Sequence, residues 1–450
     1  MPASRARLMA LSSFTVANYR SFLRPTTIEL RPLTLLFGYN NSGKSALLRV
    51  LPLLADSVGA PRGAPLNLDS AAVRGASFRD LCCQLSPRRQ IDFGLRWDDA
   101  DGDDLLRHYQ LSILELPGPQ AEVLPPAVSE FSIEGLEGLD ELGSPFAIQG
   151  TWHPKQEFQT IGQAIYDLLP STNGKEENVE PYPLEFRGIQ PGISIRGRVD
   201  IWHALMNLGH QLERLRDNVH WLGAIRRVPH RSKEFRGSAP PKLLEDGTGA
   251  LEVLVQDKLR GGTLLTTVSG WFEKHTRQRL DVTEVAPRYY ALTLGPLASP
   301  GIRVNVIDTG EGMAQVLPVL VLGAQARQEG AHGSLIALEQ PELHLHPALH
   351  ASLANYFCEL AMQPKPPRAL IETHSENFLQ GIQLAIVQGR LDPERVGVYW
   401  VQQLDDGSST VDLITFNDKG QPSRWPPGVF AEDTELARRI LKERRAKEGR

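Results

Sequence analysis

Eight consecutive residues have the types and spacing of a loop that binds phosphate groups. The segment GYNNSGKS fits the pattern G-x-x-x-x-G-K-[ST] and stands between an apolar, strand-like run and a run with helical spacing. Its glycines let backbone N–H groups converge on phosphate oxygens, and the N-terminus of the following helix adds positive potential. A chance glycine turn is the alternative, which the flanking strand and helix disfavour. The expected nucleotide-binding residues are Gly38, Asn40, Asn41, Ser42, Gly43, Lys44 and Ser45.

Two of these residues, together with a distant carboxylate, predict a magnesium site. Lys44 is expected to reach the β- and γ-phosphate oxygens, and Ser45 to offer its hydroxyl to Mg²⁺. The apolar run LIALE ends in Glu339, a carboxylate of the kind that holds the hydration shell of that ion. Buried strands that end in an acid are common, so the assignment depends on its neighbours. These are QPELHLHP directly afterwards and Thr373-His374-Ser375 after a second apolar strand.

Three segments together resemble a known group of ATPases. ALEQPELHLHP, IETHSENF and the opening NYRSF…LTLLFGYNNSGKSALL are similar to the ABC-type ATPases of the SMC/RecF/OLD group. Within it they resemble stand-alone prokaryotic ATPases, many of them associated with antiphage defence. The resemblance implies that ATP and Mg²⁺ are the cofactors and that Glu339 is the Walker-B acid. It also implies that His344 to Pro347 form the D-loop region and that His374 is the switch histidine near the γ-phosphate.

A fourth segment resembles the signature loop of the same group. The run DTGEGMAQ precedes the helical VLPVLVLGAQA, and its glycines permit close approach of backbone to a phosphate. In ABC-type ATPases this loop serves the ATP bound by the opposite subunit. The resemblance therefore implies a homodimer, or a higher oligomer built on it, in which Gly310, Gly312 and Gln315 contact the nucleotide of a partner copy.

One position departs from the pattern of this group. A catalytic glutamate usually follows the Walker-B acid, whereas here Glu339 is followed by Gln340. Glutamine cannot accept a proton as a carboxylate does, although it can orient water by hydrogen bonds. Either Glu342 is the base or turnover is slow, and the sequence leaves both open. The expected catalytic residues are Glu339, Gln340, Glu342 and His374.

A basic run, RRVPHRSKEFR from Arg226 to Arg236, has three interpretations. It is a solvated loop, an arginine that reaches ATP, or a patch for nucleic-acid phosphates. The surrounding HWLGAIRRVPHR is similar to a segment of the related ATPases, which favours Arg226 as a nucleotide-binding residue. His344, His346 and His350 could suggest a metal cluster, but roles in the D-loop and the next helix are favoured.

The elements around these motifs predict an α/β fold. Strand-like segments at 90–97, 108–116, 128–133 and 146–152 indicate an antiparallel subdomain, and later strands alternate with helices. We expect a P-loop head of the ABC type, with a mixed sheet, assembled from both chain ends around a mostly helical insertion. The expected division is 1–156 for the N-terminal half of the head, 157–286 for the insertion, 287–424 for the C-terminal half and 425–450 for a tail helix. A stripe in the insertion should face its core: Ile201, Leu205, Leu208, Leu212 and Leu215.

Composition places the chain among ordinary globular proteins. It has 450 residues, of which 41% are hydrophobic and 22% charged, and no apolar run approaches the roughly eighteen residues of a membrane span. Three cysteines without metal or disulfide spacing fit a reducing cytoplasm. The formal net charge of -5 excludes a general basic coat, so any contact with nucleic acid must be local.

These observations favour an ATPase that works as a nucleotide-gated dimeric clamp in antiphage defence or DNA maintenance, controlling an effector protein or engaging nucleic acid. One alternative is an OLD-like, nuclease-associated repair ATPase. The segment after His374 shows neither the room nor the Asp-x-Asp motif of a Toprim domain, which disfavours nuclease activity in this chain. A non-hydrolysing ATP-sensing scaffold is another alternative. The ATPase half of a transporter ranks last, because an LSGGQ loop is missing.

Overall fold

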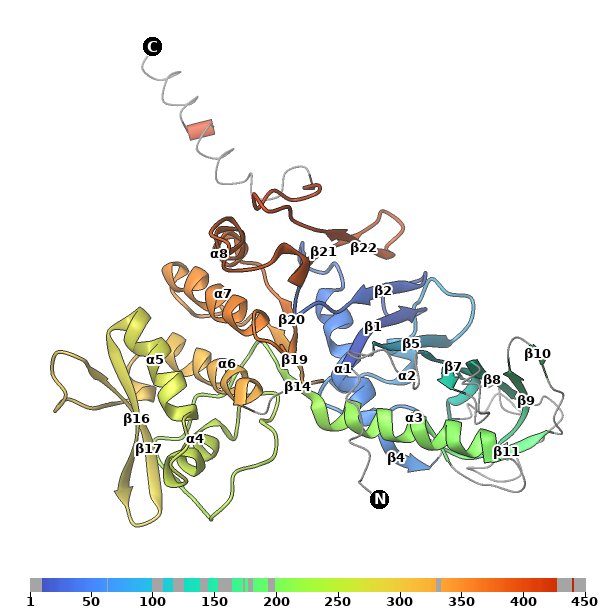
Figure 1. Ribbon diagram of the computed structural model, residues 1–450, viewed down its shortest axis with the longest axis horizontal. Helices are drawn as coiled ribbons and strands as arrows, with labels where there is room; N and C mark the ends of the chain where they lie inside the picture. Colours follow the sequence, from blue (N-terminus) through green and yellow to red (C-terminus); the bar gives the residue numbers. More distant parts are fainter. Residues whose placement is uncertain are drawn as a thin grey trace, which may run out of the picture.

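The computed structural model describes most of the chain in ordered elements (Figure 1). The described residues are 10–62, 64–98, 108–115, 125–137, 145–152, 164–172, 175–176, 181–192, 199–328, 333–426 and 439–440. The tail helix expected over 425–450 lies largely outside them. Among the helices described here, none has both the length and the apolar character needed to cross a bilayer.

A six-stranded sheet lies at the centre of the molecule. Its strand order is β14-β19-β20-β3-β21-β22, and all neighbours are parallel except the last pair. Four of its strands read as continuous apolar runs because both faces are covered. The strands are β3 (Leu33–Gly38), β14 (Val219–Leu222), β19 (Leu335–Glu339), β20 (Arg368–Glu372), β21 (Val396–Gln403) and β22 (Ser409–Ile414).

Alternate residues of the central strands face two separate cores. Leu36 on β3 packs with one cluster, and Leu35 and Phe37 pack with the other. The first core lies under α1 (Lys44–Ser57) and α3 (Val199–Asn218). The second lies under α6 (Glu311–Gln328), α7 (Pro347–Ala361) and α8 (Glu376–Val387). Helices on both faces of a mostly parallel sheet confirm the expected α/β fold.

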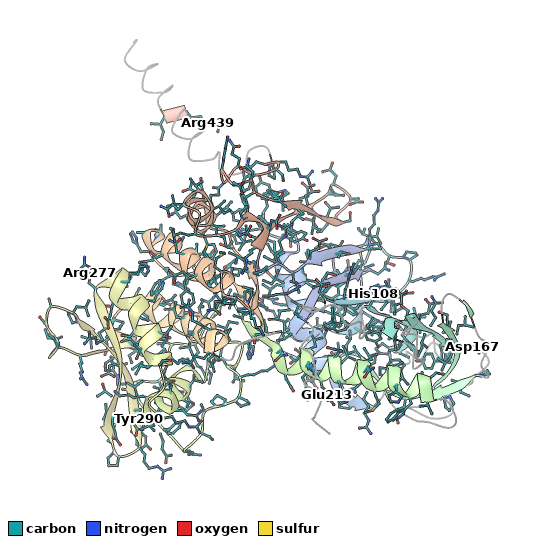
Figure 2. All side chains as sticks on the ribbon, in the orientation of Figure 1. His108, Asp167, Glu213, Arg277, Tyr290 and Arg439 are labelled. Carbon is teal, nitrogen blue, oxygen red and sulfur yellow. The ribbon has the colours of Figure 1, made fainter. Side chains whose placement is uncertain are left out.

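A nine-stranded sheet flanks the centre on one side, and His108 and Asp167 mark it in Figure 2. Its order is β10-β9-β8-β7-β6-β5-β1-β2, with β11 beside β9 and antiparallel pairing throughout. The four strands expected from the sequence are β5 to β8. Bounds are β1 (Ala10–Ala17), β2 (Thr26–Glu29), β5 (Gln90–Asp98), β6 (His108–Leu114), β7 (Ala127–Glu137), β8 (Pro145–Trp152), β9 (Ala164–Thr172), β10 (Lys175–Glu176) and β11 (Tyr182–Leu184).

The structure corrects the expectation that 157–286 is a mostly helical insertion. β9 extends the nine-stranded sheet, and Tyr166 and Leu168 are buried at alternate positions, which is the period of a strand. β14 follows α3 at once and pairs with β19, so this interval also supplies an edge of the central sheet. Two short strands, β12 (Phe186–Gly188) and β13 (Gln190–Pro191), join β4 (Val58–Arg62) in a third sheet. The expected apolar stripe is correct, since all five of its residues are buried on α3.

A smaller module packs beside α6, and Arg277 and Tyr290 mark it in Figure 2. Two helices, α4 (Ala250–Leu259) and α5 (Leu264–Thr276), pack against a four-stranded sheet. Its strands are β15 (Lys233–Glu234), β16 (Gln278–Ala286), β17 (Tyr289–Pro296) and β18 (Val304–Asn305). The expected boundary at 286 therefore falls inside the β16–β17 hairpin. Short helices complete the described elements: α2 (Phe78–Leu81), η2 (Val306–Asp308) and η3 (Pro393–Arg395).

Candidate functional site

The GYNNSGKS segment forms a tight loop between β3 and α1, as the sequence predicts. Gly38 has a φ of 152° and Gly43 a φ of 101°, in the region that favours glycine. A Cβ atom on Gly38 would lie 2.1 Å from the carbonyl oxygen of Val401, and one on Gly43 would lie 2.8 Å from Phe22. Any larger residue would have to displace β21 or the loop before β2. The neighbouring elements thus dictate glycine at both positions.

Lys44 spans this loop from the first turn of α1. Its Nζ atom donates to the carbonyl oxygens of Gly38 and Tyr39, at 3.0 and 2.7 Å. Burial lowers the pKa of this ammonium, and the nearby Glu372 carboxylate opposes the shift. Ser42 adds a buried hydroxyl with no hydrogen-bond partner among the described residues. A buried cation and an unpartnered hydroxyl in a loop at a helix N-terminus fit the phosphates of a nucleotide.

Two carboxylates meet α1 where β20 and β19 end. The Ser45 hydroxyl donates to Glu372 Oε1 at 2.9 Å. One helical turn later, Arg49 donates from Nε and Nη2 to the two oxygens of Glu339, at 2.6 Å each. Trp221 Nε1 donates to the same carboxylate at 3.3 Å. The sequence predicts that Ser45 and Glu339 bind the same metal ion. In the structure, however, Ser45 contacts Glu372, and Glu339 pairs with Arg49.

Glu372 and Arg49 are therefore site residues that sequence reasoning missed. A signal for Glu372 was present, because it ends the second apolar strand as Glu339 ends the first, and parallel strands end at one edge of a sheet. Burial raises the pKa of the Glu372 carboxyl, and the hydrogen bond from Ser45 opposes that shift. Its Oε2 atom is buried without a partner among the described residues. The oxygens of Glu372 and Ser45 are the hard ligands that Mg²⁺ prefers, so the residues present fit this ion.

The segment after β20 is tied to Glu342. The Thr373 hydroxyl donates to Glu342 Oε1 at 2.6 Å, and the backbone N–H of His374 donates to the same oxygen at 3.1 Å. The His374 ring lies 4.0 Å from Glu372. Its pKa is lowered to about 4, first by burial and then by Lys44, so the imidazole is neutral at pH 7. Glu342 thus positions the segment after β20, while its Oε2 atom has no partner among the described residues.

Gln340 is held by its backbone. Its φ is 42°, an uncommon value for a residue other than glycine, and its N–H donates to the carbonyl of Glu372 at 2.8 Å. Two of the following histidines have local partners. His346 Nδ1 accepts from the N–H of Ala348 at the start of α7, and His350 Nδ1 lies 2.7 Å from the Ser375 hydroxyl. The choice between Gln340 and Glu342 as the group that handles water stays a prediction.

Arg226 and Gln315, both expected on a nucleotide, are instead buried against each other. The Gln315 side chain accepts from the Arg226 backbone N–H at 3.1 Å and donates to its carbonyl at 2.6 Å. The Arg226 Nη2 atom donates to the carbonyls of Glu339 and Gln340, at 2.7 and 2.9 Å. Burial lowers the Arg226 pKa to about 10, so the guanidinium remains charged at pH 7. These contacts make the pair a brace between α6 and the end of β19.

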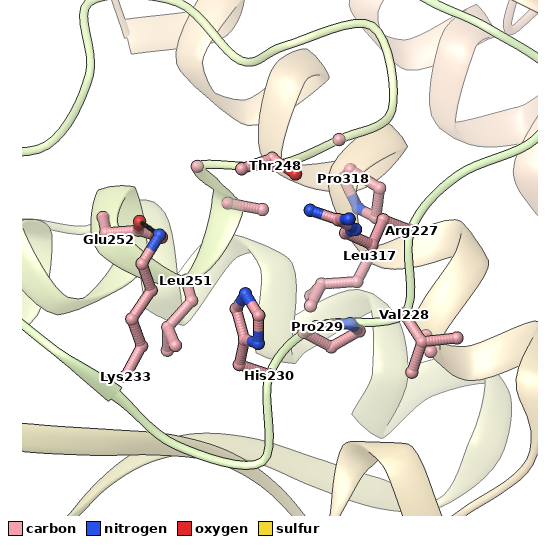
Figure 3. A pocket seen from close by; sticks show the side chains of 14 residues that line it. Arg227, Val228, Pro229, His230, Lys233, Thr248, Leu251, Glu252, Leu317 and Pro318 are labelled. Carbon is pink, nitrogen blue, oxygen red and sulfur yellow. Dashed lines mark hydrogen bonds and ion pairs between the residues drawn. The ribbon is translucent and has the colours of Figure 1, made fainter.

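Three other cations of the basic run, Arg231, Lys233 and Arg236, are engaged in ion pairs. Arg231 donates twice to Asp308 at 2.8 Å, which ties the run to the signature loop. Lys233 pairs with Glu252 at one side of a small pocket of about 30 Å³, which His230 and Leu317 also line (Figure 3). These pairs favour a structural role for the run. A patch for nucleic-acid phosphates has few free charges here, although Arg227 and His230 are exposed.

The signature loop has one exposed glycine and one packed glycine. Gly310 has a φ of 107°, and a Cβ atom on it would meet no atom within 4 Å. A Cβ atom on Gly312 would lie 2.5 Å from the carbonyl oxygen of His344 in the same chain. Gly312 therefore has an intramolecular reason to be glycine, whereas Gly310 is open to an approaching group.

A cavity of about 580 Å³ opens beside the phosphate-binding loop. Its lining includes Asn41 and Gly43 from that loop, Arg49 from α1, and Tyr19 and Arg20 from the segment after β1. This volume lies in the range of small-molecule sites and far exceeds that of the pocket at His230. A cavity of nucleoside size thus borders the loop, and Arg49 in its lining contacts the Glu339 carboxylate.

Comparison with known proteins supports this assignment. Residues 9–75 and 274–379 match the AAA ATPase domain. These two segments contain the phosphate-binding loop, the signature loop, Glu339 and His374. They make up less than half of the chain and meet in space, although 198 residues separate them in the sequence. The domain match supports an ATPase.

Several solved structures are similar in fold. A Smc head domain with an extended coiled coil, bound to the C-terminal domain of ScpA and derived from Pyrococcus furiosus, has 12% identity and a TM-score of 0.45, over 97% of this chain and 100% of that one. An SmcHead bound to the C-winged helix domain of ScpA has 12% identity and a TM-score of 0.42, over 90% and 98%. The SMC head domain from Thermotoga maritima has 11% identity and a TM-score of 0.37, over 90% and 98%. No curated protein sequence matches the chain. Identities this low assign no role to any residue.

Proposed function

We propose that this protein hydrolyses ATP with Mg²⁺ at the site formed by β3, α1, β19 and β20. The observation that carries the proposal is the position of Lys44 and Ser45 at the N-terminus of α1, with Ser45 bonded to Glu372 at 2.9 Å. Lys44 would leave the carbonyls of its own loop and contact phosphate oxygens, while the loop N–H groups hold the phosphates. A bound Mg²⁺ ion would neutralise charge on the phosphates.

Residues outside the loop would orient the phosphate and the attacking water for hydrolysis. His374 is neutral at pH 7 and can donate one hydrogen bond from its ring, and Glu342 holds the backbone N–H of His374 in place. Either Gln340 orients water or Glu342 accepts a proton through its unpartnered oxygen. If Gln340 has this role, turnover is slow, because a neutral amide lowers the barrier less than a carboxylate base.

We propose further that two copies close on ATP. The exposed loop at Gly310 would approach the nucleotide of a partner copy and add backbone N–H groups to its phosphates. A ligand that binds only the closed dimer shifts the population towards closure, and hydrolysis removes that bias. Such a clamp could control an effector protein or engage nucleic acid in antiphage defence or DNA maintenance. This wider role is proposed from the motif resemblance.

The test of ATP binding compares the buried Lys44 with the half-buried Lys242. Lys44→Ala should weaken ATP binding at least about tenfold, because it removes the phosphate-facing charge. Lys242→Ala is the matched control. Its ammonium also has a pKa lowered by burial and donates to a backbone carbonyl, that of Val219 at 2.8 Å, away from the loop. It should leave ATP affinity unchanged. Isothermal titration with ATP and a phosphate-release assay measure both effects. Wild-type affinity in a folded Lys44→Ala variant would refute the proposed function.

A further inference from the structure

We propose that Glu372, and not Glu339, is the protein carboxylate that makes nucleotide binding depend on a divalent cation. The inference rests on the proposed function and names the acidic residue of the same site. β20 lies directly between β3 and β19, so Glu372 is opposite Leu36 in the register of the neighbouring strand. Glu339 ends one strand further from the loop.

The hydrogen-bond partners of the two carboxylates also favour Glu372 as the metal ligand. Both oxygens of Glu339 accept from Arg49, so its charge is already compensated. Glu372 accepts from the Ser45 hydroxyl through Oε1, while Oε2 is buried and has no partner among the described residues. A buried carboxylate with an unpartnered oxygen is costly unless a cation or a donor completes it. The hydroxyl of Ser45 and the free oxygen of Glu372 together present two hard donors.

The cationic side chains near Glu372 do not pair with its Oε2 atom. Lys44 carries an ammonium group at this site, but its Nζ atom donates to two loop carbonyls. His374 lies 4.0 Å away, too far to donate a hydrogen bond to the carboxylate. A divalent cation at Ser45 would compensate the carboxylate directly or through a water ligand, since Mg²⁺ keeps several waters in protein sites.

Glu372 should therefore affect nucleotide affinity in opposite ways with and without a divalent cation. Without a divalent cation, the Glu372 carboxylate repels the phosphates of a nucleotide held in the loop. With the cation, the same charge attracts the metal. Replacing Glu372 by glutamine keeps the shape and a hydrogen-bond acceptor for Ser45 but removes the charge. The variant should therefore lose metal affinity while it keeps or improves affinity for metal-free nucleotide.

The experiment measures Mn²⁺ and ADP binding to the full chain. Mn²⁺ is titrated into protein with ADP and followed by electron paramagnetic resonance, and ADP in EDTA is titrated by calorimetry. We expect Glu372→Gln to weaken Mn²⁺ binding at least about tenfold, with metal-free ADP affinity equal to or above that of wild type. Glu339→Gln is the matched control at the end of the neighbouring strand, and its Mn²⁺ affinity should change less.

A second variant tests the same proposal in case Glu372→Gln does not fold. Glu372→Asp keeps the charge but withdraws it from Ser45, so it should also weaken Mn²⁺ binding. Mn²⁺ affinity within about twofold of wild type in either folded variant overturns the proposal, as does a larger loss in Glu339→Gln than in Glu372→Gln. Failure of the proposed function would look different, because wild type itself would then bind ADP neither with Mn²⁺ nor in EDTA.

Discussion

Arg49 donates to both carboxylate oxygens of Glu339, from Nε and Nη2 atoms that each lie 2.6 Å away. The side chains are 12% and 2% exposed, so the pair lies in a region of low dielectric. Such a pair contributes little net stability, yet its disruption leaves a buried charge uncompensated. The arrangement fixes α1 against the end of β19, one turn after the residue that contacts β20.

The first prediction follows from the burial of this pair. Arg49→Met and Glu339→Gln should each destabilise the protein by about 3 kcal/mol, and the double variant should lose less than the sum of the two. Urea denaturation followed by tryptophan fluorescence measures the changes. Arg74→Met is the matched control, because its guanidinium lies 3.5 Å from Glu339 but is 60% exposed. It should cost less than about 1 kcal/mol. Equal losses for the two arginine variants would contradict the argument from burial.

The second prediction concerns the brace between Arg226 and Gln315. Arg226→Lys keeps the charge but cannot donate to the carbonyls of Gln315, Glu339 and Gln340 at once. The end of β19 should then lose its fixed orientation, and kcat should fall about tenfold while KM changes little. Steady-state ATPase kinetics measure both constants. Arg227→Lys, the exposed neighbour, is the control and should behave as wild type. A rise in KM with unchanged kcat would instead indicate direct contact between Arg226 and nucleotide.

The third prediction tests whether the ATP site is shared between subunits. Gly310→Asp should inactivate a homodimer by placing a negative charge where the partner's phosphates approach, and Lys44→Ala should inactivate it at the loop. Mixed dimers of the two variants retain one intact site, so a mixture should regain part of the activity in a phosphate-release assay.

The control for this mixture is Gly310→Ala, which imposes the same strain at a φ of 107° without the charge. It should keep more activity than Gly310→Asp. Gly312 is unsuitable for this purpose, because a side chain there would meet the carbonyl of His344 in its own subunit. If subunits exchange and the mixture stays inactive, the site is not shared.

The sequence predicts well those features that depend on neighbours along the chain. The loop from Gly38 to Ser45 and the buried stripe on α3 follow from local periodicity and turn chemistry. Each is specified within one or two elements. The two cores and the overall class then follow, because buried parallel strands require helices on both faces.

Features that depend on strand order could not be predicted in the same way. Glu372 meets Ser45 because β20 is inserted between β3 and β19, and no spacing in the sequence reveals that insertion. β14 has only four residues and directly follows a helix, so its pattern is hidden by helical periodicity. Arg226 is expected on a nucleotide because HWLGAIRRVPHR is similar to a segment of related ATPases. Its burial depends on where α6 packs, which is a tertiary property.

The position of β3 between β20 and β21 has a consequence for how the protein forms during synthesis. Both neighbours of β3 come from residues 368–403, so this strand has two unpaired edges until most of the chain has left the ribosome. Contacts of such large sequence separation form slowly, and unpaired edges of apolar strands are prone to aggregation. The nucleotide site therefore cannot exist on a nascent N-terminal fragment. β20 and β21, which complete it, are made long after β3.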